Sequence, residues 1–549
     1  MDPVTEARGL EGERRYREAR ALLEPALEGA PDDGAVRVRL AVCVYKDPDL
    51  PLTRRLDNAL RILTERSDGN KPESLPDQES LGVAGAIFKR KWEADGQERN
   101  LYRALALYRR AAEEGIDADD GYTAINAAFV LDLLADLERR QDSASSYHRD
   151  RRAEADDWRR RIVDSLKPRL ERGDGVEWWP LVTIAEALIG LGHAEEAEPW
   201  VQKAADLKHA DDEGRRPKPW EIESTARQVA ALIRLRQDRP DVEAFSESAA
   251  GMRLQELLGP DWSAGLETAW IGKIGLALSG GGFRASLFHI GVLARLAELD
   301  VLRRVEVLSC VSGGSIIGAY YYLKVRQLLQ DKPDAQLDRE DYLKLVGEIE
   351  RDFLEAIGSN VRMRLLTSPV RVFQMAVARG YTRTERAGQL YQEKLYSQLG
   401  SDDFRLPDLL VHPAGEESDF KPKHDNWRRS AKVPILVINA TTMNTGHNWQ
   451  YTASWMGEPP SSIDDDVDSA DRLRRMYHDE APEKHARTPL GRAVAASAAV
   501  PGLFPPVSKR NLYPGLTVRL SDGGVHDNQG IASLLEQDCA VILVSDASG

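Results

Sequence analysis

The spacing of hydrophobic residues changes about halfway along this chain of 549 residues. In roughly the first 240 residues, small and bulky apolar residues recur three and four positions apart, as on one face of a helix. From Ile274 onward, short apolar runs alternate with amphipathic segments, which predicts strands that are each followed by a helix. The pattern therefore indicates a helical N-terminal half and an α/β C-terminal half.

The helical half carries a degenerate repeat of small, bulky and small residues. Its copies are Ala19–Leu23–Ala26, Ala104–Tyr108–Ala111 and Ala197–Val201–Ala204, with a partial copy at Ala59–Leu63. Alanines let antiparallel helices approach closely, and bulky residues fill the space to the next pair. The copies are less regular than the ~34-residue period of tetratricopeptide (TPR) repeats. We expect a TPR-like helical repeat domain over residues 1–240, with an irregular helical bundle as the alternative.

The second half reads as a domain over residues 271–549, after a linker with some helix at 241–270. Strands are expected at 274–279, 305–310, 434–441, 516–521 and 541–545, with helices at 285–299 and 315–329 and a charged, mainly helical stretch at about 332–432. This order predicts a three-layer α/β domain with a mostly parallel sheet. A helix normally follows the last strand of such a sheet, so we expect the domain to be incomplete at its C-terminus.

The composition, 42% hydrophobic and 30% charged, is that of a soluble globular protein. The N-terminus has no apolar stretch suited to a signal peptide and the sequence has no run of 18 apolar residues, so we expect any membrane contact to be peripheral. The net charge of -15 argues against nucleic acid as a partner. The three cysteines lie far apart without metal-ligand spacing, which indicates a reducing compartment. We expect a cytoplasmic protein with transient membrane association and without metal or other cofactor.

Ser312 lies between a predicted strand that ends at Val311 and a helix that begins near Ser315. A serine on so sharp a turn is held in a strained backbone conformation, with its hydroxyl exposed above the sheet. Such an elbow needs small neighbours, which Gly313 and Gly314 provide. Cys310 departs from the usual G-x-S-x-G pattern, because it stands where that pattern has its first glycine. Ser312 is a candidate nucleophile, and an N-cap serine is the alternative.

Gly280, Gly281 and Gly282 join a predicted strand to a helix. Successive N–H groups of such a loop can point at one developing negative charge, so we expect an oxyanion hole, with Gly281 and Gly282 as the main donors. A phosphate-binding loop is the competing interpretation, but no complete nucleotide motif is present. Arg284 is expected either to bind a lipid phosphate or to brace the loop through an ion pair.

Asp522 follows a predicted strand and precedes two glycines. In a dry site its carboxylate would accept the proton of the Ser312 hydroxyl and later return it. On its own, Asp-Gly-Gly is an ordinary turn. A catalytic triad would also need a histidine. We expect His289 to pack in the core, and His526 leaves a triad open as the alternative to a dyad.

Three motifs therefore occur in order, each beside a predicted strand: Ser279–Arg284, Val311–Ser315 and Asp522–Val525. With Ala496–Pro506, they make this half resemble a patatin-like phospholipase domain, related to the cytosolic phospholipase A2 catalytic core. The resemblance implies a Ser312–Asp522 dyad, oxyanion donors at Gly281 and Gly282, and metal-free hydrolysis of fatty-acyl esters of phospholipids or other lipids.

The helical half resembles, more distantly, the TRAF-binding, TPR-like modules of multidomain proteins. Gly121–Ala128 and Ala185–Ala187 carry this likeness. It implies a protein partner that binds the helical repeats. Two rivals to a lipid hydrolase therefore stay open: a weak or inactive scaffold that acts through its repeats, and a carboxylesterase for small esters.

Two further segments invite a functional interpretation. Asp464, Asp466 and Asp468 alternate as in a calcium loop, but the glycine and the final glutamate of such a loop are missing, which predicts a solvated acidic loop. Val361–Tyr381 mixes apolar residues with arginines. We expect an ordinary surface helix there, with a lipid-interface helix as the alternative.

Overall fold

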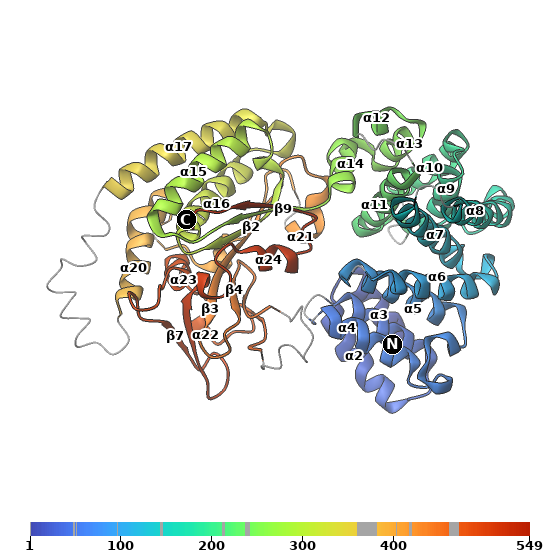
Figure 1. Ribbon diagram of the computed structural model, residues 1–549, viewed down its shortest axis with the longest axis horizontal. Helices are drawn as coiled ribbons and strands as arrows, with labels where there is room; N and C mark the ends of the chain where they lie inside the picture. The colour runs from blue at the N-terminus through green and yellow to red at the C-terminus, as the bar shows by residue number, and fades with distance from the viewer. Residues whose placement is uncertain are drawn as a thin grey trace. The chain divides into compact units, whose positions relative to one another are not determined.

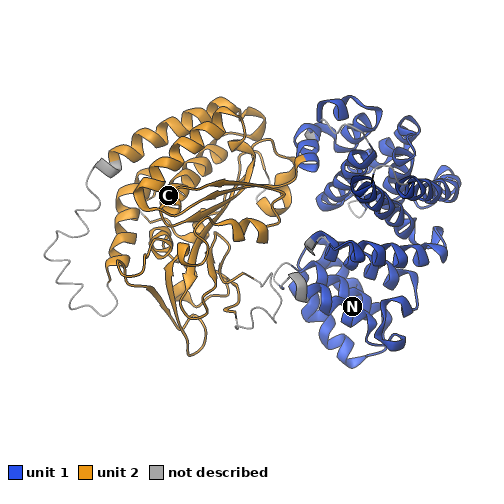
Figure 2. Ribbon diagram, in the orientation of Figure 1, with its two compact units in different colours: residues 1–270, 461–464 blue, residues 271–460, 465–549 orange. Residues whose placement is uncertain are grey.

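The chain forms two compact units, one over residues up to Trp270 and one from Ile271 onward (Figure 2). The computed structural model describes residues 2–548 except 48–49, 51, 96, 143–145, 211–214, 237–241, 359–381, 402, 417–419 and 460–471. The acidic loop at 464–468 and the helix at 361–381 that the sequence suggested both lie outside the described residues.

The described part of the first unit is helical (Figure 1). Its helices are α1 (Pro3–Gly12), α2 (Tyr16–Gly29), α3 (Gly34–Lys46), α4 (Leu52–Thr64), α5 (Gln78–Asp95), α6 (Glu98–Glu113), α7 (Tyr122–Gln141), α8 (Tyr147–Glu171), α9 (Trp178–Gly190), α10 (Ala194–Leu207), α11 (Pro219–Arg236), α12 (Val242–Glu247), α13 (Ala249–Leu258) and α14 (Trp262–Ile271). From α1 to α10 each helix packs against the next, and the odd-numbered helices contact one another in turn. This is the packing of a helical repeat. The expected TPR-like region is confirmed.

The repeated small residues lie where the helices of this unit meet. Ala19, Ala104 and Ala197 are fully buried. Tyr108, the bulky residue of the second copy, lies over Gly85 of α5, where a Cβ would come within 3.0 Å of its ring. Close helix approach through small residues thus explains the repeat seen in the sequence.

Residues 241–270, expected as a linker, contain three helices that belong to the helical unit. Helix α13 packs against α10 and α11. Phe245 of α12 is buried and stacks on Trp270 of α14 with 4.6 Å between ring centroids. These apolar residues extend the core of the unit to residue 270. The turn at Gly259 and Pro260 therefore separates two helices of one unit and does not mark a domain boundary.

Within its described residues, the second unit is built on a sheet of nine strands with the order β6-β5-β4-β3-β2-β1-β9, where β8 pairs with β3 and β7. The strands are β1 (Ile274–Leu278), β2 (Val305–Val311), β3 (Ile435–Thr442), β4 (Asn448–Tyr451), β5 (Trp455–Gly457), β6 (Met476–Tyr477), β7 (Val507–Arg510), β8 (Thr517–Asp522) and β9 (Val541–Ser545). Strands β9, β1, β2 and β3 are parallel, with β9 at the end of the strand order, which confirms the predicted parallel part of the sheet. The outer pairings are antiparallel.

Helices cover both faces of this sheet (Figure 1). They are α15 (Gly282–Glu298), α16 (Gly313–Asp331), α17 (Arg339–Gly358), α20 (Arg383–Tyr391), α21 (Pro422–Asp425), α22 (Glu483–Ala486), α23 (Leu490–Ser497) and α24 (Ile531–Glu536). Leu276 and Leu308 share a core cluster with residues of α15 and α16. Ala277 and Val307, which point the opposite way along their strands, pack instead with Leu534 of α24. The unit is therefore a three-layer α/β domain, as predicted.

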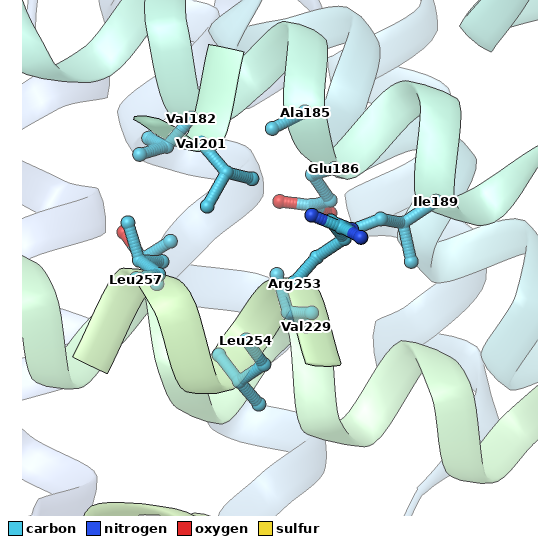
Figure 3. Close-up of a pocket in the computed structure, with 10 residues that line it drawn as sticks. Val182, Ala185, Glu186, Ile189, Val201, Val229, Arg253, Leu254 and Leu257 are labelled. Atoms are coloured by element: carbon cyan, nitrogen blue, oxygen red, sulfur yellow. The ribbon is translucent and has the colours of Figure 1, made fainter. Parts of the chain in front are cut away.

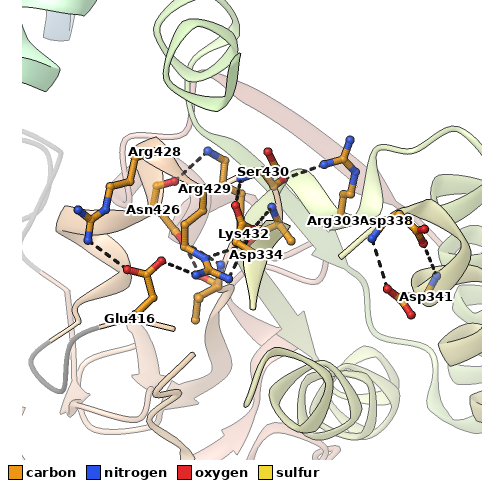
Figure 4. A network of polar contacts seen from close by, with 12 residues as sticks. Arg303, Asp334, Asp338, Asp341, Glu416, Asn426, Arg428, Arg429, Ser430 and Lys432 are labelled. Carbon is orange, nitrogen blue, oxygen red and sulfur yellow. Dashed lines mark hydrogen bonds and ion pairs between the residues drawn. The ribbon is translucent and has the colours of Figure 1, made fainter. Parts of the chain in front are cut away.

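A polar network anchors the segment that leads into β3 (Figure 4). Asp334, which follows α16, accepts a hydrogen bond from the backbone N–H of Ser430 at 2.9 Å. The fully buried Arg429 lies 3.5 Å from the same carboxylate, and Arg303 donates to the Ser430 carbonyl at 3.2 Å. These contacts hold the entrance of β3 beside β2, and so they help to set the register on which the site depends.

Candidate active site

The ends of β2 and β8 meet along one edge of β3. Val311, the last residue of β2, pairs with Asn439 of β3. The next residue of β3, Ala440, pairs with Asp522 at the end of the antiparallel strand β8. Because β4 occupies the other edge of β3 at these positions, β8 continues along the edge that β2 leaves. This arrangement brings together Ser312 and Asp522, which are far apart in the sequence.

Ser312 lies on the sharp turn between β2 and α16 that the sequence predicted. Its backbone has φ 49° and ψ -113°, a conformation rarely adopted by a non-glycine residue. The turn is packed tightly, because a Cβ on Gly314 would lie 2.2 Å from the carbonyl oxygen of Leu278. Gly313 is equally restricted, since its Cβ would lie 2.1 Å from the Gly282 carbonyl oxygen. The elbow thus admits only glycine at both positions after the serine.

Asp522 is buried, with 6% of its surface exposed. Its Oδ1 accepts a hydrogen bond from the Gly524 amide at 2.8 Å, while Oδ2 has no fully formed hydrogen bond. Burial raises the pKa of the Asp522 carboxyl, and hydrogen bonding from the Gly524 amide and the nearby Ser312 hydroxyl opposes that shift. A desolvated carboxylate next to a serine hydroxyl is a stronger base than an aspartate in water.

Ser497, at the end of α23, is a further residue of this site that sequence reasoning did not single out. Its side chain is fully buried, and its Oγ accepts a hydrogen bond from the Ser312 amide at 2.9 Å. The same hydroxyl contacts Ser315 Oγ at 2.8 Å and donates to the Asn439 carbonyl. The only signal in the sequence was its position within the Ala496–Pro506 stretch.

The glycine loop at residues 280–282 lies directly against the elbow. Gly281 and Gly282 have φ values of 140° and 66°, which favour glycine. Within the part of the chain that the structure describes, neither of their amides donates to a protein acceptor. The Gly280 amide, in contrast, donates to the Asn528 carbonyl at 2.9 Å. The N–H of Gly280 is therefore not free to bind an oxyanion, because it already donates to Asn528. This corrects the expectation that Gly280 would be part of the oxyanion hole.

Cys310, the departure from the G-x-S-x-G pattern, is accommodated by a glycine on the next helix. The Cys310 side chain is fully buried, and burial raises the pKa of its thiol. A Cβ on Gly318 would lie 2.2 Å from its Sγ. Gly318 thus leaves the room that the larger residue at position 310 occupies. The turn at Ser312 keeps its geometry despite the missing glycine.

The two histidines differ in the way the sequence suggested. His289 is buried and joins two strand ends, since its ring nitrogens contact Ser545 Oγ at 2.7 Å and the Ser279 carbonyl at 3.0 Å. Burial lowers its pKa. His526 is exposed, and its Nδ1 contacts the Gly446 carbonyl at 3.1 Å. Neither ring is bonded to Ser312 or Asp522, so the geometry favours a dyad over a triad.

Arg284 is exposed in the first turn of α15, two residues after the glycine loop. It makes no ion pair with any residue that the structure describes, so these residues do not support the expectation that Arg284 braces the glycine loop through an ion pair. Among the described residues, no group of three or more His, Cys, Asp and Glu side chains could hold a metal ion. Within the same residues, no helix is long and apolar enough to cross a membrane.

A parallel sheet with a serine on a strained strand-to-helix turn is the arrangement of α/β acyl hydrolases. Comparison with known families agrees, because residues 276–535 match the model of patatin-like phospholipases. Residues 15–131 match the model described as Tetratricopeptide Repeats-Sensor. The chain therefore carries a patatin-like phospholipase domain, which is the domain of a lipid acyl hydrolase, and TPR-like repeats precede it in the sequence. No curated protein matches the chain.

The helical unit holds one further feature, a small pocket between α9, α10, α11 and α13 (Figure 3). Its walls are mostly apolar, with Val182, Val201 and Leu254 among them, and its volume of about 10 Å³ suffices for one water molecule. Glu186 lies in this wall and accepts hydrogen bonds from Gln228 Nε2 at 3.0 and 3.1 Å. Burial raises the pKa of Glu186 to about 7. The pocket contains none of the predicted catalytic residues.

Proposed function

We propose that the second unit hydrolyses fatty-acyl esters of lipids through a Ser312–Asp522 dyad. The observation that carries the proposal is the meeting of β2 and β8 along β3, with Ser312 on a strained turn after one strand and the buried Asp522 at the end of the other. The family match supports lipid hydrolysis in general, and the dyad is the finer statement that rests on this geometry.

The proposed reaction begins when the Ser312 Oγ attacks the acyl carbonyl carbon and its proton passes to the Asp522 carboxylate. The negative charge that develops on the carbonyl oxygen is stabilised by the amides of Gly281 and Gly282. Asp522 returns the proton to the leaving alcohol as the ester bond breaks. A water molecule then gives its proton to Asp522 and hydrolyses the acyl-enzyme, which regenerates the Ser312 hydroxyl.

The dyad is tested by turnover of purified protein on a phospholipid and on a soluble ester. We expect Ser312→Ala and Asp522→Asn each to lose most of the activity, by a factor of about 10³ or more. Ser508→Ala, an exposed serine on β7, is the matched control and should retain the wild-type rate. Near wild-type turnover in either dyad variant would refute the assignment.

An inactive scaffold and a small-ester esterase are distinguished by two simpler measurements. A fluorophosphonate reacts with an activated serine, so covalent labelling that Ser312→Ala abolishes rules out an inert site. A phospholipase should hydrolyse phospholipid vesicles faster than monomeric short-chain esters. The reverse ratio would indicate an esterase for small substrates.

We further propose that the helical unit binds a protein partner and so regulates the hydrolase. The support is the match of residues 15–131 to a TPR-type sensor model, because helical repeats present extended surfaces for protein contact. The rate of vesicle hydrolysis should differ between the full chain and a chain that begins at Ile271, once thermal unfolding shows that the shorter chain is folded. Equal rates would mean that the repeats alone do not control the enzyme.

A further inference from the structure

The segment that follows α23 ends in an exposed apolar turn. Val500 is 39% exposed and Leu503 is 65% exposed. No charged residue occurs from Ala493 to Val507. A contiguous uncharged stretch with exposed large apolar side chains is unusual on a protein surface that is otherwise rich in charge.

This turn is ordered by its own backbone. The amides of Leu503 and Phe504 donate to the Val500 carbonyl at 3.1 and 3.0 Å, and Gly502 has φ 84°. The hydroxyl of Thr384 in α20 donates to the carbonyl of Pro505. The apolar side chains are therefore presented by a preorganised turn, so that binding through them costs little conformational entropy.

The turn adjoins the catalytic pair through main-chain contacts. The Ala499 carbonyl accepts hydrogen bonds from the Asp522 amide and from Ser521 Oγ, both at 3.0 Å. Val525, three residues after Asp522, is 59% exposed and adds a further apolar side chain. The same segment carries Ser497, whose hydroxyl holds the Ser312 amide. The apolar turn is thus tied by hydrogen bonds of its own segment to the backbone of both members of the proposed dyad.

We propose that the apolar turn at Val500–Leu503, together with Val525, inserts into an uncharged lipid surface and presents the acyl ester to Ser312. The inference rests on the proposed function, since the substrate of the site must come from that surface. A lipid surface fits because burial of exposed apolar side chains in hydrocarbon is favourable and the turn contains no charge that would have to be desolvated. The net charge of -15 favours a neutral membrane over an anionic one.

The first test measures binding without hydrolysis. Full-length protein with Ser312→Ala is sedimented with phosphatidylcholine vesicles, with and without Leu503→Ser. We expect Leu503→Ser to weaken partitioning about tenfold, as loss of one buried leucine side chain would do. Leu299→Ser is the matched control, because Leu299 is 52% exposed but stands between Glu298 and Asp300. Equal partitioning of the Leu503→Ser and Leu299→Ser variants would overturn the proposal.

The second test locates the contact directly. An environment-sensitive dye is attached through Leu503→Cys or, as the control, Leu299→Cys in the same inactive background. We expect vesicles to shift the emission to the blue only for the dye at position 503. No shift at position 503 overturns the proposal and would fit a turn that is covered by a protein. Both tests avoid turnover, so vesicle binding can hold even if the dyad assignment fails.

Discussion

The hydroxyl oxygen of Ser497 accepts a hydrogen bond from the backbone amide of Ser312 at 2.9 Å. This contact holds Ser312, the proposed nucleophile, in its strained conformation, with φ 49°. Two residues later, the Ala499 carbonyl binds the amide of Asp522. A three-residue segment therefore fixes the backbone of both proposed catalytic residues, which makes Ser497 a positioning residue.

Replacement of this hydroxyl should loosen the elbow. We expect Ser497→Ala to lower kcat about 10- to 100-fold, because a small misplacement of a nucleophile has effects of this size. The rate of fluorophosphonate labelling should fall in parallel, while KM for vesicles changes little. A loss of stability without slower labelling would show that Ser497 serves folding only.

The elevated pKa of Asp522 predicts the acid side of the pH–rate profile. The carboxylate must be ionised to accept the serine proton, so kcat falls as the pH drops through the pKa of Asp522. Because burial raises this pKa, the midpoint should lie above the ordinary aspartate value of 3.8. Single-turnover acylation of a soluble ester between pH 3.5 and about 8 would measure it. A midpoint at or below the ordinary value would contradict the buried site.

The raised pKa of Asp522 also predicts that the ionised carboxylate lowers the stability of the folded protein. Ionised Asp522 destabilises the folded state at neutral pH, since its folded pKa exceeds the unfolded value. Asp522→Asn should therefore unfold at a higher temperature than the wild type at pH 7, by on the order of 1 kcal/mol in stability, while it loses activity. The difference should shrink as the pH falls through the folded pKa and vanish below the unfolded one. A variant less stable than the wild type at pH 7 would oppose this explanation.

Cys310 and Gly318 should be energetically coupled. Gly318→Ala would normally favour a helix, but its methyl group would meet the Cys310 sulfur, so we expect a loss of about 1–3 kcal/mol. Cys310→Ala removes that sulfur. The double variant should therefore be more stable than Gly318→Ala alone, with a coupling energy of about 1–2 kcal/mol in chemical denaturation. Additive effects would show that the two residues do not share this space.

Glu186 should make the helical unit pH-sensitive. Its pKa of about 7 exceeds the unfolded value, so the folded state loses stability as the pH rises from about 4.5 to 7. We expect Glu186→Gln to be more stable than the wild type above pH 7, by on the order of 1 kcal/mol, and similar to it below pH 4.5. Urea unfolding followed by circular dichroism at several pH values measures this difference. Its presence at low pH would point to another cause.

The sequence predicted the centre of the second unit well, because β1, β2 and β3 are mainly apolar runs whose residues are almost all buried, and β9 is a further apolar run beside β1. It missed β4, β5, β6 and β7, which are short and form by antiparallel pairing with neighbouring strands. Some helix was expected at 241–270, but that segment was interpreted as a linker, because the burial of its apolar side chains against the helical unit becomes visible only in the fold.

The sequence predicted those residues of the candidate site that belong to local motifs. Ser312 and Asp522 each follow a strand and precede glycines, and the structure brings them together. The roles of Ser497 and Gly318 were not predicted. Ser497 contacts Ser312, which is distant in the sequence, and Gly318 contacts Cys310, which belongs to another element. The use of the Gly280 amide by Asn528 likewise depends on a contact across 248 positions (528 − 280).

The end-to-end meeting of β2 and β8 also has a consequence for synthesis of the protein. Ser312 leaves the ribosome 210 residues before Asp522 (522 − 312). A nascent chain therefore holds the proposed nucleophile without the proposed base while much of the sheet is still being translated. An unfinished chain is therefore expected to lack the proposed hydrolase activity until β8 has been translated.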